Sequence, residues 1–216
     1  QPPKTTKKMK TLSNYRAEAR KQLSGNWLSS ALFVFVYMLV TYALGSVSLL
    51  GGNNRALSTP LTLLGIAFAA PLEYGACLAF LKQARGEEMQ IGHLFSGYNK
   101  RTGIAMILKT VYTLLWMMLL IVPGIVKNYS YAMTSFILAD NPDMTGEQAI
   151  CRSMEMMKGN KLRLFKLDLS FLGWLILTVF TLFIGIFWLE SYILQTRAAF
   201  YEDLKAEESV EAVEKE

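Results

Sequence analysis

The sequence predicts an all-α protein, a polytopic membrane helix bundle with about six transmembrane helices in three hairpins and with amphipathic helices at the membrane interface. Three observations predict this fold. Of the 216 residues, 52% are hydrophobic and 18% are charged, and the apolar residues form long runs. The basic residues lie mostly beside those runs, and one pattern of helix breaks recurs along the chain. We expect a single integral membrane domain over residues 13–204.

The chain begins with polar residues that lead into a first span. Residues 1–12 are rich in Lys, Thr and Pro, and we expect a disordered basic N-terminus, either a trimmed start or a tag. Residues 13–23 repeat apolar side chains at helical spacing, which predicts an amphipathic helix at the membrane interface. Its other face carries Arg16, Arg20 and Lys21, and we predict that these cations contact lipid headgroups.

The first apolar run is long enough to cross a bilayer. Residues 27–50 contain 24 positions without an ionisable group. As a helix this run is about 36 Å long, and the hydrocarbon core is about 30 Å thick. A turn-rich loop over residues 51–60 follows, which predicts that the chain reverses direction there.

The second predicted span, residues 61–81, contains Pro71 and Glu73. A carboxylate near the middle of a span is costly, so a proton-relay or ion site is one hypothesis for Glu73. The structural alternative is a neutral, protonated Glu bonded to a neighbouring helix, or one at the mouth of a locally broken span. We take Glu73 and Pro71 as the candidate intramembrane functional site, on a helix that the proline breaks.

The third predicted span, residues 104–122, ends at Pro123 and Gly124, which break helices. Lys109 lies near its cytoplasmic end, where snorkelling or pairing would explain it. The next apolar stretch, residues 125–139, has only 15 residues, so a buried or re-entrant helix is an alternative to a crossing.

The last part of the chain predicts a loop, a helix and two more spans. Thr145 and Gln148 have the spacing of a capping box, which predicts a helix after the loop at residues 140–148. We divide the long apolar stretch that follows into spans at residues 164–183 and 186–201. Residues 205–216 are rich in Glu and Lys without an apolar stripe, and we expect an acidic cytoplasmic tail that is solvated or frayed.

A repeat supports the division into hairpins. The 25-residue spacing from Asn99 to Gly124 recurs from Asn160 to Gly185. The pattern Gly-Ile-x-x-x-x-Ser-Tyr begins at each of these two glycines. A third copy would begin at residues 25–26 and contain a longer external loop. Each copy would place a crossing, a tight turn and a shorter crossing back after an interfacial helix.

Lysine and arginine are distributed unevenly between alternate connections. Residues 1–26, 82–103 and 140–166 carry seven, four and five of these cations, whereas the intervening turns carry only Arg55 and Lys127. Because cytoplasmic segments retain Lys and Arg, both termini and the three basic segments are predicted to be cytoplasmic. The predicted headgroup contacts in the third segment are Lys158, Lys161, Arg163 and Lys166.

The sequence has no pattern typical of a catalytic or metal site. His93 is the only histidine, which excludes a histidine triad and a multi-histidine metal site. Cys77 and Cys151 have neither disulfide nor metal-ligand spacing, and we interpret both as free thiols. Phosphate-binding glycine loops and nucleophile elbows are also missing. We predict no catalytic residue, no metal, no cofactor, no enzymatic activity and no nucleic-acid partner.

Three segments carry a resemblance to a known family. They are "ILADNPDMTGEQAICRSMEMMKGNKLRLFKLDLSFLGWLIL", "VPGIVKNYSYAM" and "AAFYEDL", of which "SMEMMKGNK" and "FYEDL" are the most distinctive. Over residues 13–204 the chain resembles the bacterial membrane-protein family catalogued as domain of unknown function 975. The resemblance implies a multi-pass protein of the cytoplasmic membrane without an assigned activity or catalytic residues. A proline that this family leads us to expect near Ser191 is missing.

The leading functional hypothesis is a non-enzymatic integral protein of the bacterial inner membrane. Its cytoplasmic basic helices would contact anionic lipid or a protein partner, which includes a second copy of the chain. The alternative is a small transporter or channel that uses Glu73. A third class, a lipid-modifying enzyme, would have to use Asp140, Asp143 and Asp168 as its acids and bases.

Overall fold

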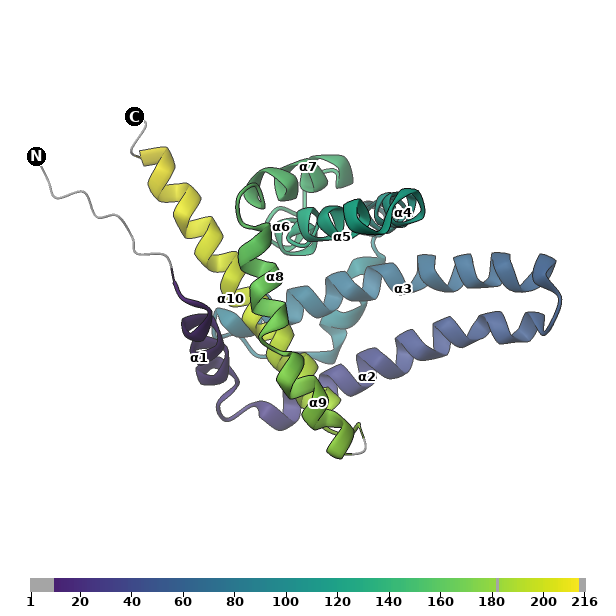
Figure 1. Cartoon of the computed structure of the whole chain (residues 1–216), viewed down its shortest axis with the longest axis horizontal. Coiled ribbons are helices and arrows are strands. Elements are labelled where there is room, and N and C mark those ends of the chain that lie inside the picture. The colour runs from purple at the N-terminus through teal and green to yellow at the C-terminus, as the bar shows by residue number, and fades with distance from the viewer. Residues whose placement is uncertain (1–9, 182, 214–216) are drawn as a thin grey trace, which may run out of the picture.

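The computed structural model describes residues 10–181 and 183–213, and all regular elements in that part of the chain are helices (Figure 1). The predicted all-α fold is therefore confirmed. The elements in chain order are α1 (Leu12–Leu23), α2 (Trp27–Ser46), the 3-10 helix η1 (Val47–Gly51), α3 (Arg55–Ala84), the 3-10 helix η2 (Ile91–Tyr98), α4 (Lys100–Leu119), α5 (Ile121–Ser130), α6 (Thr134–Asp140), α7 (Gly146–Met156), α8 (Lys161–Leu169), α9 (Leu172–Phe180) and α10 (Ile186–Val213).

Among the described residues, three helices are long and apolar enough to cross a membrane. They are α2 with η1, α3, and α4, and they contain the first three predicted spans. Their outward faces carry large apolar side chains such as Leu39, Leu63 and Leu115, each more than half exposed. Such surfaces are unusual on a water-soluble monomer, so these helices indicate membrane association.

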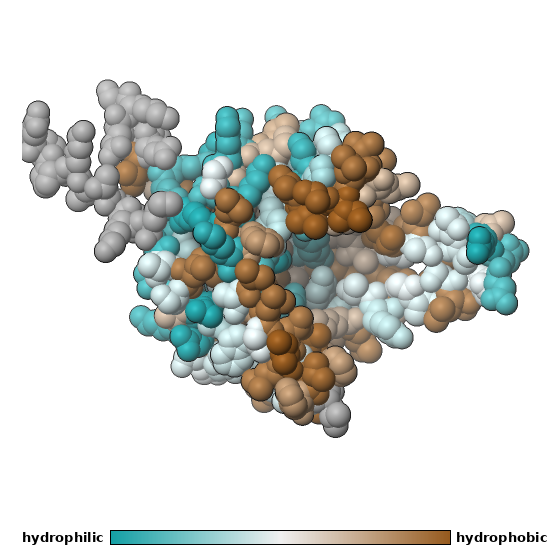
Figure 2. All heavy atoms as spheres, in the orientation of Figure 1, coloured by the Kyte–Doolittle hydropathy of each residue, from teal (hydrophilic) through white to brown (hydrophobic). Residues whose placement is uncertain are grey.

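Three pairs of helices pack side by side as hairpins, namely α2–α3, α4–α5 and α9–α10. In the first pair the helices approach closely at Gly65, where a Cβ would lie 2.5 Å from the Leu44 carbonyl oxygen. Hydrophobic residues gather over α4, α5 and α9 in Figure 2, and hydrophilic residues gather around α1 and α7 and at the turn of the α2–α3 hairpin. We call the hydrophilic part formed by α1, α7 and the second half of α10 the polar base, and the hairpins extend from it.

The predicted turn at Pro123 and Gly124 is wrong by three residues. The break lies at Leu120, whose φ of −157° and ψ of 132° are extended. Pro123 lies in the first turn of α5, where its missing N–H removes no intrahelical hydrogen bond. Gly124 lies against α4, and a Cβ there would be 2.8 Å from the Met117 Cα. The glycine therefore serves the packing of the hairpin and does not break the helix.

The predicted fourth, fifth and sixth spans are not single long apolar helices within the described residues. The stretch at 125–139 is divided between α5 and the buried helix α6. The stretch at 164–183 is divided between α8 and α9 at Ser170 and Phe171. Helix α10 has 28 residues, but its second half is polar. Periodicity did not indicate these breaks because each interruption consists of residues that also occur within helices.

Pro71 does not break its helix, contrary to prediction, since α3 is continuous over 30 residues. A proline inside a helix leaves a carbonyl in the preceding turn without its donor. In that turn the Tyr98 hydroxyl donates to the Phe68 carbonyl at 2.6 Å. Tyr98 belongs to η2, which crosses α3 so closely that a Cβ on Gly97 would lie within van der Waals overlap of the Pro71 carbonyl. This crossing supplies polar and packing contacts where the proline weakens the helix.

The two termini are more ordered than predicted. Helix α1 already begins at Leu12, and Lys10 pairs with Glu18 at 2.8 Å. Residues 1–9 of the predicted disordered N-terminus lie outside the described residues. At the other end, the predicted tail continues α10 as far as Val213, so it is not a frayed end over residues 205–213.

Two local predictions can be compared directly with the structure. The capping box of Thr145 and Gln148 is confirmed at the start of α7. Asn26, Asn99 and Asn160, the asparagines at the repeated breaks, are the N-cap residues of α2, α4 and α8. The repeat itself stays a prediction, because α4 is one helix where its counterpart is divided into α8 and α9.

Candidate functional site

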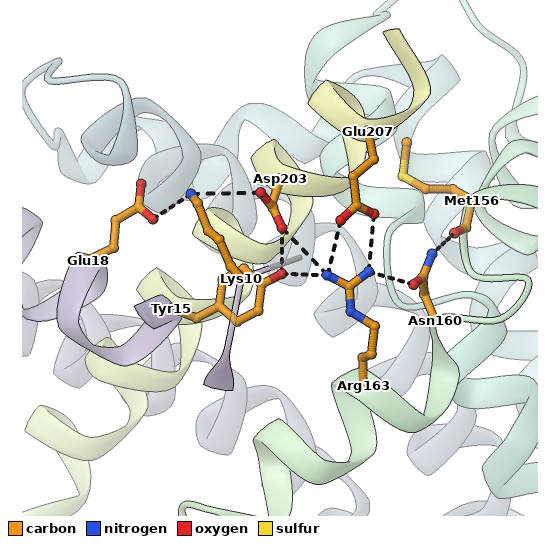
Figure 3. Close-up of polar contacts among 8 residues, drawn as sticks. All are labelled: Lys10, Tyr15, Glu18, Met156, Asn160, Arg163, Asp203 and Glu207. Atoms are coloured by element: carbon orange, nitrogen blue, oxygen red, sulfur yellow. Dashed lines mark hydrogen bonds and ion pairs between the residues drawn. The ribbon is translucent and has the colours of Figure 1, made fainter. Parts of the chain in front are cut away.

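The polar base is organised by the second half of α10, which carries acidic residues that face cations from other helices. We call the cluster around Arg163 the polar hub, and Figure 3 shows how its side chains point toward one another. Its members are Lys10, Tyr15, Glu18, Asn160, Arg163, Asp203 and Glu207.

Arg163 makes contacts with three other parts of the chain. Its guanidinium group reaches both carboxylate oxygens of Glu207, at 3.1 and 3.2 Å, and donates to the Tyr15 hydroxyl at 2.7 Å. It also donates to the Asn160 side chain at 2.7 Å. The Arg163 side chain is only 17% exposed. Bidentate pairing of this kind is among the stronger charge-assisted contacts. Arg163 therefore links α8 to α10 through Glu207 and to α1 through Tyr15.

Tyr15 and Asp203 are the most deeply buried residues of the polar hub. The Tyr15 hydroxyl donates to Asp203 at 2.5 Å, and the Asp203 side chain is 1% exposed. Burial, together with this hydrogen bond, raises the pKa of Tyr15 well above its usual range. Tyr15 therefore stays protonated and acts as a donor at physiological pH.

A second cluster joins α3, α6 and α10 at Asp140. Its carboxylate pairs with Arg85 and Lys205, each at 2.6 Å, and accepts a hydrogen bond from Tyr201 at 3.0 Å. Burial alone would raise the pKa of Asp140, but the hydrogen bonds from Lys205, Arg85 and Tyr201 outweigh it and hold the pKa below its usual value. The charged form of Asp140 therefore contributes to stability.

This shift predicts a dependence of stability on pH. Because the native pKa of Asp140 is below the unfolded value of about 3.9, its contribution is present above that value and is lost as pH falls through the native pKa. We expect Asp140→Asn to lower the free energy of unfolding by about 2 kcal/mol at neutral pH. The variant should also lose less stability than the parent on acidification below about pH 4. Denaturant titrations in detergent at a series of pH values measure both effects.

Asp143→Asn is the matched control for this prediction. Asp143 is fully exposed and pairs with Arg101 at the surface, at 3.0 Å. The control should leave the free energy of unfolding unchanged within experimental error, because an exposed surface ion pair contributes little. Parallel acid profiles for the Asp140 variant and the parent protein would contradict the assigned role of Asp140.

Glu73, the predicted intramembrane site, pairs with Lys109 at 2.5 Å. The Lys109 side chain is 8% exposed, and that of Glu73 is 44% exposed. Snorkelling and pairing were the two expectations for Lys109, and pairing is confirmed, because its ammonium group contacts Glu73 of α3. Glu73 does contact a neighbouring helix, as the structural alternative expected, but its partner is a lysine and the contact is an ion pair. This pair joins α3 to α4 in the apolar part of the bundle.

Asp168 also lies in an ion pair, with Arg197 at 2.9 Å, and it accepts a hydrogen bond from Tyr129 at 3.1 Å. The pair connects α8 with α10, and Tyr129 adds α5. Pairing was one of the expectations for Asp168, and it is confirmed. The enzyme hypothesis would need three carboxylates as acids and bases. Each of them has a cation partner, and they are Asp140, Asp143 and Asp168.

The predicted headgroup contacts separate into two groups. Arg163 lies inside the polar hub, so its prediction as a headgroup contact is corrected, because Glu207 and Tyr15 already occupy its guanidinium group. The other six have no ion-pair partner among the described residues. They are Arg16, Arg20, Lys21, Lys158, Lys161 and Lys166, and all six are exposed or half-buried.

Sequence reasoning missed the acidic half of these clusters. Glu202 pairs with Arg85, Glu207 with Arg163, and Glu208 with Arg152. The signal was present in the spacing, because positions 203 and 207 are one helical turn apart and therefore share a face of α10. We instead interpreted residues 205–216 as a solvated or frayed tail.

The fold and its clusters define a class of protein, an all-helical protein with long apolar helices on a polar base held together by ion pairs. The chain belongs to the family described as "Protein of unknown function (DUF975)", which matches residues 96–208 and thus just over half of its length. The matched region includes α4 to α9 and most of α10. No curated protein and no solved structure matches the chain.

Proposed function

We propose that this chain is a non-enzymatic, multi-pass protein of the bacterial cytoplasmic membrane whose basic face binds anionic phospholipid headgroups. Both termini are cytoplasmic in this proposal. Each hairpin returns the chain to the side from which it started, and α1 packs against α10, which supports a common side for the termini (Figure 1).

One observation carries the lipid-binding part of the proposal. Six of the seven cations predicted at the headgroups lack a carboxylate partner among the described residues, whereas the cations of the clusters are paired. A Lys or Arg near an anionic membrane surface contributes about 1 kcal/mol of attraction. Unpaired cations beside apolar helices are therefore available to anionic headgroups.

The non-enzymatic part is supported by the use of the carboxylates. Asp140 and Asp168 are both held in ion pairs that join helices, and Glu73 has its counter-charge in Lys109. A general acid or base needs to exchange protons with a substrate at the working pH. Carboxylates engaged in this way serve the packing of the bundle. The same pairing removes the isolated charge that motivated a transporter.

The test is a comparison of retained lipids by native mass spectrometry after extraction from vesicles of mixed phosphatidylglycerol and phosphatidylcholine. We expect the protein to retain phosphatidylglycerol in preference. A variant with Lys158, Lys161 and Lys166 replaced by Gln should lose most of that preference, whereas Arg55→Gln, at the turn of the α2–α3 hairpin, should keep it. Equal retention of the two lipids by the parent protein would refute the proposal.

A further inference from the structure

A cavity of ≈ 390 Å³ lies between α1, the start of α2, and the α9–α10 hairpin. Its size lies within the range of small-ligand pockets, which is about 300–1,000 Å³. Three of the four tryptophans of the chain line it. The lining residues that matter here are Arg20, Trp27, Trp174, Leu177, Trp188 and Tyr192.

Aromatic contacts fix the shape of the cavity. The Tyr192 ring is buried and makes edge-to-face contacts with Trp27 and Trp174, at centroid distances of 6.1 and 6.4 Å. Such pairs are favourable in this geometry, so the two indoles are held in place on either side of Tyr192. Trp188 and Leu177 are partly exposed, which leaves the cavity open toward the apolar surface of the hairpin.

The three hydroxyl groups that line the cavity already donate hydrogen bonds within the protein. The Thr178 hydroxyl donates to the Leu175 carbonyl at 2.7 Å, and the Tyr192 hydroxyl donates to the Arg16 carbonyl at 3.1 Å. Thr181 likewise donates to the Thr178 carbonyl, at 2.9 Å. Arg20 is the one charged residue of the lining, and it has no ion-pair partner in the part of the chain that the structure describes.

The cavity extends along the start of α10, from Gly185 to Tyr192. The Tyr192 hydroxyl contacts the Arg16 carbonyl of α1, one helical turn before Arg20, while Gly185 lines the cavity near the hairpin turn. Seven residues of helix separate Gly185 from Tyr192, a distance of about 10 Å. A ligand that fits this arrangement has an anionic head and an apolar chain.

We propose that this cavity binds one anionic glycerophospholipid, with its phosphate at Arg20 and the upper part of one acyl chain between Trp174, Trp188 and Tyr192. A guanidinium group matches phosphate oxygens in a bidentate manner, which favours this headgroup chemistry. The site deepens the proposed function, on which it rests, because it names one position at which an individual lipid is held.

Tryptophan fluorescence tests this site directly. The parent protein in a neutral detergent is titrated with dibrominated phosphatidylglycerol and, in parallel, with dibrominated phosphatidylcholine, because bromine quenches nearby indoles. We expect saturable quenching by the anionic lipid and weaker quenching by the neutral lipid. Arg20→Gln should weaken the apparent affinity for phosphatidylglycerol about tenfold, the effect of losing one charged hydrogen-bonding group.

Lys21→Gln is the matched control, because it removes the same charge from the neighbouring exposed residue, which does not line the cavity. It should leave the affinity for the detergent-solubilised lipid within about twofold of the parent, because solvent and salt screen an exposed charge outside the cavity. Equal effects of the two substitutions, or equal quenching by the two lipids, would overturn the site. Tighter quenching by a dibrominated free fatty acid would overturn the choice of a phospholipid.

The two proposals fail in different ways. If quenching does not depend on Arg20 but the triple lysine variant still loses retained phosphatidylglycerol, the cavity proposal fails and the headgroup proposal stands. If the triple lysine variant retains as much phosphatidylglycerol as the parent but quenching depends on Arg20, the headgroup proposal fails and the cavity proposal stands. Unfolding midpoints of Arg20→Gln and Lys21→Gln that equal that of the parent establish that both variants are folded.

Discussion

Replacement of Arg163 by methionine should lower the free energy of unfolding by about 3 kcal/mol, because breaking a mostly buried ion pair leaves a charge without its partner. Glu207 would lose its bidentate contact, and Asp203, with a side chain 1% exposed, would lose one of its cations. Tyr15 would also lose a donor. Denaturant titration of the purified protein in detergent measures the change.

Two further substitutions give this experiment its control. Lys158→Met removes one positive charge from an exposed position in the same basic segment and should change the free energy by less than about 0.5 kcal/mol. Arg163→Lys keeps the charge but loses the bidentate geometry, so it should fall between the two. Equal stability of Arg163→Met and Lys158→Met would show that the polar hub does not hold the helices together.

Glu73→Gln should lower the free energy of unfolding by roughly 3 kcal/mol, because it leaves the Lys109 ammonium group buried without a counter-charge. Lys109→Met should be less costly, since the Glu73 carboxylate is partly exposed. Combining both substitutions should recover most of the loss, because a neutral pair leaves no buried charge. The double-mutant cycle in detergent therefore predicts a coupling energy of about 2 kcal/mol.

Additive effects of the two substitutions would contradict the structural role of the pair. The double variant also separates structure from transport, since it is expected to fold and yet lacks the carboxylate. If Glu73 served a flux of protons or solutes, proteoliposomes of the parent would carry that flux and those of the double variant would not. We expect no difference between them.

Local patterns predicted the helices well. The runs that begin near Trp27, Leu61 and Ile104 each lie in a helix long enough to cross a membrane. The Thr145 and Gln148 capping box marks the start of α7 as predicted. These features depend on residues within one or two helical turns, which a single sequence displays directly.

Contacts between distant residues could not be predicted in the same way. Arg163 and Tyr15 are 148 positions apart, and nothing in the composition around Arg163 distinguishes it from Lys158 or Lys161. All of these residues resemble headgroup contacts in sequence. Only the helix packing shows that one of them is paired with α10. Pairing was expected for Lys109, but its partner could not be named for the same reason, because Glu73 lies on another helix.

The segments that carried the family resemblance have structural roles in these clusters. In "FYEDL", Phe200 lies against Tyr15 and Arg163, Tyr201 bonds to Asp140, and Asp203 bonds to Tyr15. In "SMEMMKGNK", Ser153 donates to the Ser130 carbonyl at 2.8 Å. Residues of these two segments therefore hold α10 and α7 in place in this chain.

In the proposed topology, the polar base and the turn of the α2–α3 hairpin lie on opposite sides of a membrane. Cys151 on α7 is exposed and Cys77 is buried, so the native protein carries one accessible thiol. Asn53 is exposed in the hairpin turn, and Asn53→Cys with Cys151→Ser places the thiol there instead. The measurement is labelling with a membrane-impermeant maleimide in intact cells and in inverted vesicles. We expect labelling of Cys151 only in inverted vesicles, and of the Asn53 variant only in intact cells. Labelling of both positions from the same side would contradict it.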